Sequence, residues 1–311
     1  MKLAHAVATY VAYKQSLGIR FVTDARTLTS FCRTLGEIEM DQVSADRVSA
    51  FLAGTGPVTR FWHRKLDALR GFYRFALARG LGSSSPLPTR APRSPRAFVP
   101  YLYSREEIKR LLAATENRSG CHLSSCTCRT LLLLLYGSGL RISEALALDL
   151  ADVDLNTGIL CIRESKFYKT RLVPIGVDLV RVLARYAEES NRCSATTPLT
   201  PFFLTRDSGR PSRASAETAF KQIRERAGVR REDGARYQPR LHDMRHVFAV
   251  NRLVSWYRQG ADVQRLLPRL ATYLGHVNVA ATAHYLTMTP ELLQEASRRF
   301  ERYAKGGDDH A

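Results

Sequence analysis

Residue types that bind or attack a phosphate stand at short, regular spacings in the second half of the chain. His242 and Arg245 are three positions apart, so on a helix they share one face and can address the same anion. A Leu-Gly-His triplet ending at His276 is followed nine positions later by Tyr285. A phenol, with a pKa of about 10, is a poor nucleophile at neutral pH unless cations and a base assist it. His242 and Arg245 therefore predict an anion-binding face, and a tyrosine could act as a nucleophile only where such groups surround it.

A further arginine stands where a helix is predicted to begin. Arg141 directly follows a Gly-Ser-Gly-Leu stretch and precedes a run with helical spacing, a place from which a guanidinium can be aimed at an anion. An isolated arginine in such a place is more often a surface residue. Glu144, three positions later, is its expected ion-pair partner.

A short hairpin is predicted between these two regions. Residues 159–162 and 171–174 have the composition of strands, and the polar segment between them carries Lys166 and Lys169. The pKa of a lysine falls readily when the side chain is desolvated near other cations, which suits a lysine to protonating a leaving oxygen. The alternative is a basic hairpin that only touches backbone phosphate, and this is our interpretation of Lys169.

Two metal-site interpretations compete with this reading. His242 and His246 are four positions apart, and Asp243 could join them, but the glutamate of an H-E-x-x-H site is absent and Arg245 would place a positive charge beside the metal. A second candidate combines Cys121, His122, Cys126 and Cys128. It contains no C-x-x-C pair, so we favour reduced thiols. No Walker-type phosphate loop and no carboxylate cluster for two magnesium ions is found. We therefore expect neither a metal nor a cofactor.

The overall charge points to a polyanionic partner. The 311 residues include 47 Lys plus Arg against 29 Asp plus Glu, a formal charge of +18. The longest apolar run, Leu131 to Leu135, is too short to span a bilayer, and the N-terminus lacks the apolar core of a signal peptide. These features predict a cytoplasmic protein that is associated with the nucleoid, with no membrane partner.

The elements that must position these residues fall into two domains. Residues 1–82 show only helical periodicity, and a predicted helix over 59–79 has a basic face. Residues 83–100 form a basic, proline-rich linker, residues 101–304 the second domain and residues 305–311 a tail. The expected fold is mainly α with a small antiparallel β-sheet. The candidate DNA-contacting residues outside the pocket are Arg60, Arg64, Lys65, Arg70, Arg93, Arg96 and Lys169.

The four motifs, in their order along the chain, resemble the catalytic signature of the tyrosine recombinase, or integrase, family. The resemblance implies a helical core-binding domain, a catalytic domain, and strand cleavage and rejoining through a 3′-phosphotyrosine without metal or ATP. It implies double-stranded DNA as the partner and a homotetramer on DNA, with related recombinases as further partners. Counting back from Val173-Pro174 matches the family lysine to Lys166. The family more often has small residues after this lysine, and because Phe167 and Tyr168 stand here, Lys169 is a second choice for that role. The catalytic residues that the resemblance implies are Arg141, Lys166, His242, Arg245, His276 and Tyr285.

Two other functions remain open on sequence grounds. One is a DNA-binding protein that keeps this fold without catalysis, and the other is relaxation of supercoils in the manner of a type IB topoisomerase. The complete set of candidate residues argues against the first. The helical N-terminal unit and the predicted C-terminal helix favour an integrase over the second, by analogy of fold.

Overall fold

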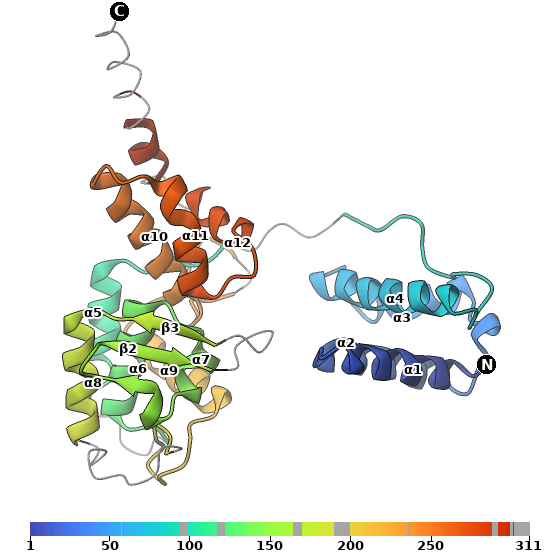
Figure 1. Cartoon of the computed structure of the whole chain (residues 1–311), viewed down its shortest axis with the longest axis horizontal. Coiled ribbons are helices and arrows are strands. Elements are labelled where there is room, and N and C mark those ends of the chain that lie inside the picture. Colours follow the sequence, from blue (N-terminus) through green and yellow to red (C-terminus); the bar gives the residue numbers. More distant parts are fainter. Residues whose placement is uncertain are drawn as a thin grey trace, which may run out of the picture. The chain divides into compact units, whose positions relative to one another are not determined.

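The computed structural model describes residues 1–56, 58–93, 99–116, 122–163, 170–189, 200–235, 237–287, 292–298 and 301. Lys166, Lys169 and Arg96 lie outside the described residues, as do Cys121 and the predicted cap of the C-terminal helix at 289–291. The chain separates into two compact units, Met1–Phe98 and Val99–Ala311 (Figure 1). Among the described residues, no helix is both long and apolar enough to cross a membrane.

The first unit is helical and has its own core. Its helices are α1 (Leu3–Ser16), α2 (Val22–Leu35), α3 (Ala45–Ala53) and α4 (Arg60–Ala78), with a 3₁₀ turn, η1 (Met40–Gln42). α4 packs against the other three helices, and its apolar side chains Leu66, Leu69 and Phe72 are fully buried. The hydroxyls of Ser44 and Thr59 cap α3 and α4.

The second unit is built around a buried central helix, α6 (Ser125–Ser138), which packs against α7, α8, α9 and α10. The helices of this unit are α5 (Arg105–Ala113), α6, α7 (Ile142–Ala147), α8 (Val177–Glu189), α9 (Arg213–Arg226), α10 (Asp243–Arg258), α11 (Val263–Leu274) and α12 (Ala280–Ala283). Two 3₁₀ turns, η2 (Leu150–Asp152) and η4 (His284–Thr287), complete the set, and residues 292–298 are helical as well.

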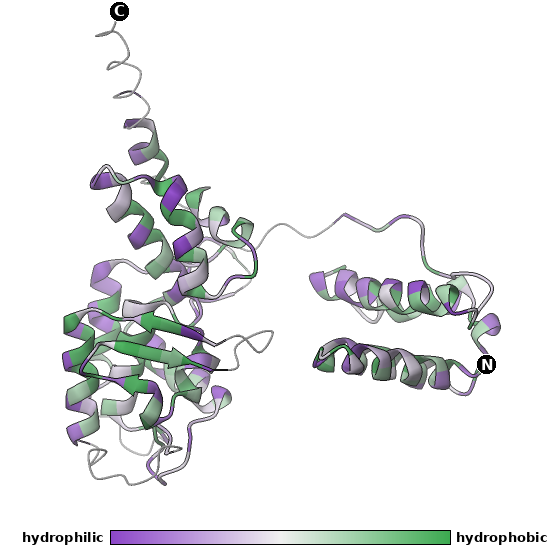
Figure 2. Cartoon of the chain, viewed as in Figure 1, coloured by the Kyte–Doolittle hydropathy of each residue, from purple (hydrophilic) through white to green (hydrophobic). Residues whose placement is uncertain are grey.

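A small antiparallel sheet lies beside these helices. The strands β1 (Val153–Asp154), β2 (Ile159–Ile162) and β3 (Arg171–Pro174) pair in that order, with Ile162 opposite Arg171 at the end of the β2–β3 ladder. β2 and β3 have the bounds that the sequence predicts, whereas β1 is too short to leave a pattern. The two long strands are mostly hydrophobic (Figure 2). The predicted fold class, mainly α with a small antiparallel sheet, is confirmed.

The apolar helix that contains Leu131 to Leu135 ends within Gly137-Ser138-Gly139, where the glycines predict a break. α6 continues through Gly137 and Ser138 and ends at Gly139, which adopts a left-handed conformation with φ of +63°. A Cβ at Gly139 would come within 2.5 Å of the Phe248 ring, so the backbone there packs directly against α10. Gly139 is thus both a helix stop and a point of close approach, and it places Arg141 at the N-cap of α7.

Candidate active site

Arg141 is held by hydrogen bonds to Glu144 on α7 and to the backbone at the end of α11. Its Nη1 donates to Oε1 of Glu144 at 2.6 Å, and its Nη2 donates to the carbonyl oxygen of Gly275 at 2.9 Å. The Glu144 carboxylate also accepts from the backbone N–H of Arg141, so the expected ion pair is confirmed as part of a capping box at the start of α7. The side chain is 26% exposed, which leaves part of the guanidinium open to a ligand.

Arg245 is the most deeply buried charged group of the site. It lies in the first turn of α10, with 2% of its surface exposed, and donates to the carbonyl oxygens of Gly139 and Leu274. Burial, reinforced by the nearby charge of Arg141, lowers the pKa of Arg245 to about 10. The group stays charged at neutral pH, and the two carbonyls hold it in one orientation.

The C-terminal end of α11 supplies the acceptors for these arginines. Gly275 ends this helix in a left-handed conformation, and the carbonyls of Leu274 and Gly275 accept hydrogen bonds from Arg245 and Arg141. Unpaired carbonyls at a helix C-terminus carry partial negative charge, which favours cations there. The Leu-Gly-His triplet therefore positions the two guanidiniums through its backbone, while presenting His276 directly after the turn.

His276 is held by a residue that the sequence did not single out. Its Nδ1 lies 2.6 Å from Oγ1 of Thr282, a fully buried hydroxyl on α12. This contact orients the ring and leaves Nε2 as the nitrogen that can address a substrate. Burial, with Arg245 next in importance, lowers the pKa of His276 to about 4, so the ring is neutral at pH 7.

Tyr285 lies among these groups on η4. It is 3% exposed, and its ring stacks on His276 with 6.1 Å between centroids. The Arg245 guanidinium lies close enough to act on the phenol. Burial raises the pKa of Tyr285, while the positive charges of Arg245 and Arg141 act in the opposite direction. The phenol is therefore protonated at neutral pH, beside two cations that would stabilise negative charge on it.

Two histidines at the start of α10, His242 at its N-cap and His246 in its first turn, border Tyr285. The ring of His246 makes edge contacts with His242 and Tyr285 at centroid distances of 5.2 and 5.5 Å. His242 keeps exposed surface at the pocket wall, yet the protein around it removes enough water to lower its pKa to about 4. Burial lowers the pKa of His246 to about 3. Both rings are uncharged at neutral pH and can accept a proton or a hydrogen bond.

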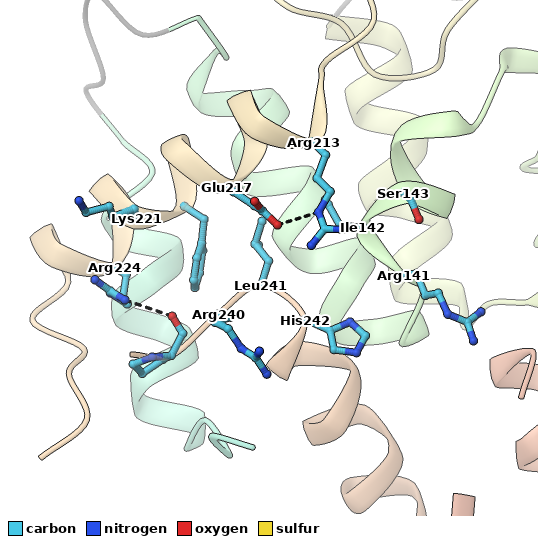
Figure 3. Close-up of a pocket in the computed structure, with 12 residues that line it drawn as sticks. Arg141, Ile142, Ser143, Arg213, Glu217, Lys221, Arg224, Arg240, Leu241 and His242 are labelled. Carbon is cyan, nitrogen blue, oxygen red and sulfur yellow. Dashed lines mark hydrogen bonds and ion pairs between the residues drawn. The ribbon is translucent and has the colours of Figure 1, made fainter. Parts of the chain in front are cut away.

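An open pocket leads away from Arg141 and His242 (Figure 3). It has a volume of about 590 Å³ and is bounded on one side by α9, from which Arg213, Lys221 and Arg224 project. Arg213 forms an ion pair with Glu217 at 2.8 Å, and Arg224 donates to the carbonyl of Pro239 at 3.2 Å. The basic side chains that line the pocket would attract a polyanion towards Arg141 and His242.

The candidate DNA-contacting residues of the first unit differ in how available they are. Arg60 and Arg64 are exposed on α4, and Arg93 is exposed in the linker. Lys65 instead donates its ammonium to the carbonyl of Phe51 at 2.6 Å and lies over the Phe51 ring. Arg70 is exposed and makes a 3.4 Å ion pair with Asp67. Arg60 and Arg64 are therefore more available to contact a DNA phosphate than Lys65 and Arg70, whose charged groups already have partners.

The two metal interpretations gain no support from the part of the chain that is described. No three His, Cys, Asp or Glu side chains there are grouped so that they could share a metal ion. Cys126 lies on α6, where its thiol contacts a carboxylate oxygen of Glu189 at 3.1 Å. His246 faces Tyr285 as well as His242, which assigns the His-His pair to the tyrosine pocket.

Sequence reasoning missed two residues of this site, and it considered His246 only as a metal ligand. Arg171 binds Glu144 through two nitrogens, and Thr282 orients His276. His246 packs against Tyr285. A signal for Arg171 was present in the predicted hairpin. Arg171 begins the second strand and lies opposite Ile162, which is buried, so its charge needs a partner inside the protein. Nothing in the local pattern around Thr282 distinguishes it from an ordinary helical threonine.

Comparisons with known proteins agree with this geometry. The model of the phage integrase family matches residues 102–291. The chain is 37% identical over 303 residues to a protein of Sinorhizobium fredii named integrase/recombinase y4rB, with 96% of each chain covered. It is 33% identical over 310 residues to tyrosine recombinase XerD of Mycobacterium tuberculosis, covering 91% of this chain and 94% of the relative.

Solved structures share the fold. The Tn1549 transposon integrase in complex with a circular intermediate DNA has a TM-score of 0.71 at 14% identity, covering 97% of this chain and 99% of that one. A lambda integrase dimer bound to a core site has a TM-score of 0.61 at 17% identity, covering 90% and 96%.

Proposed function

Because the chain belongs to the phage integrase family and is a tyrosine recombinase, we propose that Tyr285 is the nucleophile with which it cuts and rejoins DNA. One observation carries this assignment. Tyr285 lies where the positive charges of Arg245 and Arg141 both act on its phenol, and the two guanidiniums meet at the carbonyl oxygen of Leu274, to which both donate. A nucleophile and two phosphate-binding cations therefore meet at one point of the second unit.

The two arginines are suited to hold a scissile phosphate. Arg141 and Arg245 would bind its non-bridging oxygens and stabilise the charge of the pentacovalent phosphorane, a role that preorganised donors fill most effectively in a site with little water. His242 and His276, both neutral at pH 7, would complete the pocket as hydrogen-bonding groups. The tyrosine then attacks an electrophile that the arginines have oriented and polarised.

The reaction that we propose is a balanced exchange of one phosphoester for another. The Oη of Tyr285 forms a bond to phosphorus, the bond from phosphorus to the 5′ oxygen breaks, and Lys166 protonates the leaving oxygen. The phenolic proton passes to a neutral imidazole of the site or to water. Attack by a 5′-hydroxyl of another strand reverses these steps, so the number of phosphoesters is conserved and no ATP is needed. Lys166 takes its role from the family motif, with Lys169 as a phosphate contact.

Double-stranded DNA is the proposed partner. The formal charge of +18 and the basic pocket between α9 and the start of α10 support it. The structures that share this fold include a lambda integrase tetramer bound to a Holliday junction, which supports a tetramer on DNA for this chain as well. Exposed arginines of the first unit, Arg60 and Arg64, would contribute contacts to the phosphate backbone.

The test is covalent capture of DNA. Duplexes that bind the protein are selected from a random pool, and one of them is nicked near the cleavage site so that the cleaved product cannot be resealed. The wild-type protein should become linked to a 3′ phosphate, seen as a band of reduced mobility after denaturation. Tyr285→Phe should form no adduct. Tyr273→Phe, whose hydroxyl donates to the carbonyl of Pro174, is the matched control and should react like wild type.

Two results would contradict the proposal. Adduct formation by Tyr285→Phe would show that the nucleophile is another residue, and a wild-type protein that binds the selected DNA without linking to it would be a silent binder. Incubation of two selected duplexes then separates recombination from topoisomerase activity. A recombinase yields exchanged strands, whereas an enzyme that only relaxes supercoils yields none.

A further inference from the structure

Arg171, the first residue of β3, is held by every nitrogen of its guanidinium. Nη1 and Nη2 donate to the two carboxylate oxygens of Glu144 at 3.1 and 2.8 Å, and Nε donates to the carbonyl of Tyr273 at 2.9 Å. The side chain is 10% exposed and Glu144 is 6% exposed, so the pair is shielded from water. A two-pronged contact of this kind requires the planar fork of an arginine, which a lysine cannot reproduce.

Glu144 is therefore a buried anion between two cations. Its Oε1 accepts from Nη1 of Arg141 at 2.6 Å and from Nη1 of Arg171 at 3.1 Å. The three side chains together carry a net charge of +1, two positive and one negative. Without Arg171, the pair of Arg141 and Glu144 would be neutral. The charge of Glu144 would then cancel the positive charge with which Arg141 attracts a phosphate.

We propose that Arg171 is a positioning residue of the recombinase site, which neutralises Glu144 so that the positive charge of Arg141 remains available to the scissile phosphate. The inference rests on the proposed function, because it assigns Arg171 to the support of a phosphate-binding arginine. Under this proposal Glu144 keeps Arg141 in position, and because Arg171 balances its charge, Glu144 does not weaken the attraction of the site for an anion.

The glycine of the Leu-Gly-His triplet gives independent support. A Cβ at Gly275 would lie 2.8 Å from Nη1 of Arg171, closer than such atoms approach in proteins. The absence of a side chain at Gly275 therefore leaves the space that the Arg171 guanidinium occupies. Arg171 thus joins Arg141 and Arg245 in binding the carbonyls at the end of α11, through Tyr273, Leu274 and Gly275.

The electrostatics of Glu144 agree with this role. Burial acts to raise the pKa of this carboxyl, but the hydrogen bonds and charge of Arg171, followed by those of Arg141, hold it below its ordinary value. Glu144 is consequently ionised at neutral pH, and its negative charge has to be balanced within the site. Arg171 contributes most to that balance.

The experiment measures single-turnover adduct formation on the nicked, selected duplex. Arg171→Ala should slow this step by roughly 100-fold, the scale seen when preorganised support of a phosphate or oxyanion site is removed. The double variant Arg171→Ala/Glu144→Gln removes the unbalanced anion together with its partner and should react at least about tenfold faster than Arg171→Ala, if charge balance dominates. Arg171→Lys should fall between wild type and Arg171→Ala.

Two controls separate this role from general damage to the hairpin. Arg163→Ala removes an exposed arginine that follows β2 and pairs with Asp152, and it should react like wild type. The second control uses DNA in which sulfur replaces the leaving 5′ oxygen, because a thiolate leaves without a proton donor. This DNA should restore the rate of Lys166→Ala but not that of Arg171→Ala, since Arg171 acts through Arg141.

The outcomes separate the role of Arg171 from the proposed function. A wild-type protein that forms no adduct contradicts the proposed function and this inference with it. If the wild type reacts, a wild-type rate for Arg171→Ala would overturn the role of Arg171 alone. So would a folded double variant that is no faster than Arg171→Ala, with folding verified by thermal unfolding of each variant.

Discussion

Arginines occur in both units, but in opposite settings. On α4 of the first unit, Arg60 and Arg64 are exposed. In the second unit, Arg245 and Arg171 are 2% and 10% exposed, and both are held by backbone carbonyls. Exposed, flexible cations attract a polyanion at long range and with little geometric demand, whereas buried and oriented cations act on one phosphate. From this comparison we expect that different arginines carry affinity for DNA and chemistry on DNA.

The largest expected effect comes from changing a buried arginine to lysine. Arg245→Lys keeps the charge but cannot bind the carbonyls of Gly139 and Leu274 while also reaching Tyr285. We expect adduct formation to fall by about 100- to 1,000-fold. Arg64→Lys, made on the exposed face of α4, should leave both the rate and the affinity close to wild type. Equal effects of the two substitutions would contradict the distinction between buried, oriented arginines and exposed ones.

A glycine substitution should have an intermediate effect. Gly275 and Gly260 both have left-handed backbones, with φ of +67° and +69°. An alanine at Gly260 would meet no atom within 4 Å, so it should cost only the conformational penalty of about 1–2 kcal/mol. Gly275→Ala should destabilise the protein by more and should also slow cleavage, because it displaces Arg171. Denaturant unfolding and the cleavage rate measure both effects, and equal changes at the two glycines would show that the close approach of Arg171 is unimportant.

The smallest expected effect on chemistry comes from the exposed arginines. Arg60→Ala/Arg64→Ala should weaken DNA binding and reduce the slope of log affinity against log salt by about 0.9 for each phosphate that the protein no longer neutralises. At saturating DNA the rate of adduct formation should be unchanged. Arg33→Ala, an exposed arginine on α2, serves as the control for removal of charge alone. A fall in the saturated rate would show that α4 takes part in the chemistry.

The local features of this fold could be predicted from the sequence. Strands at 159–162 and 171–174 and the Arg141–Glu144 pair follow from patterns over a few residues. So does the cap at Ser44, which stands directly before an apolar helical run. The break expected within Gly137-Ser138-Gly139 falls at its last residue, because Gly137 continues a helix that tertiary packing holds.

The contacts that bring the site residues together from distant parts of the chain could not be predicted in the same way. Arg141 bonds to a carbonyl 134 residues further along the chain, and Arg171 to one 102 residues further. Nothing in a local pattern indicates which backbone carbonyls a guanidinium will meet. The motifs therefore indicated which side chains matter, while the acceptors that orient them, and the second cation on Glu144, required the three-dimensional structure.

The support of Arg141 and Arg245 by peptide oxygens has a consequence for how this protein can change. A peptide oxygen is present whatever side chain the residue carries, so substitutions that preserve the end of α11 leave the support of the reacting centre in place. The basic side chains that line the neighbouring pocket, such as Arg213 and Lys221, make no bond to those oxygens within the described part of the chain. We therefore expect that substitutions of Arg213 or Lys221 change the charge of the pocket without disturbing the hydrogen bonds that hold Arg141 and Arg245.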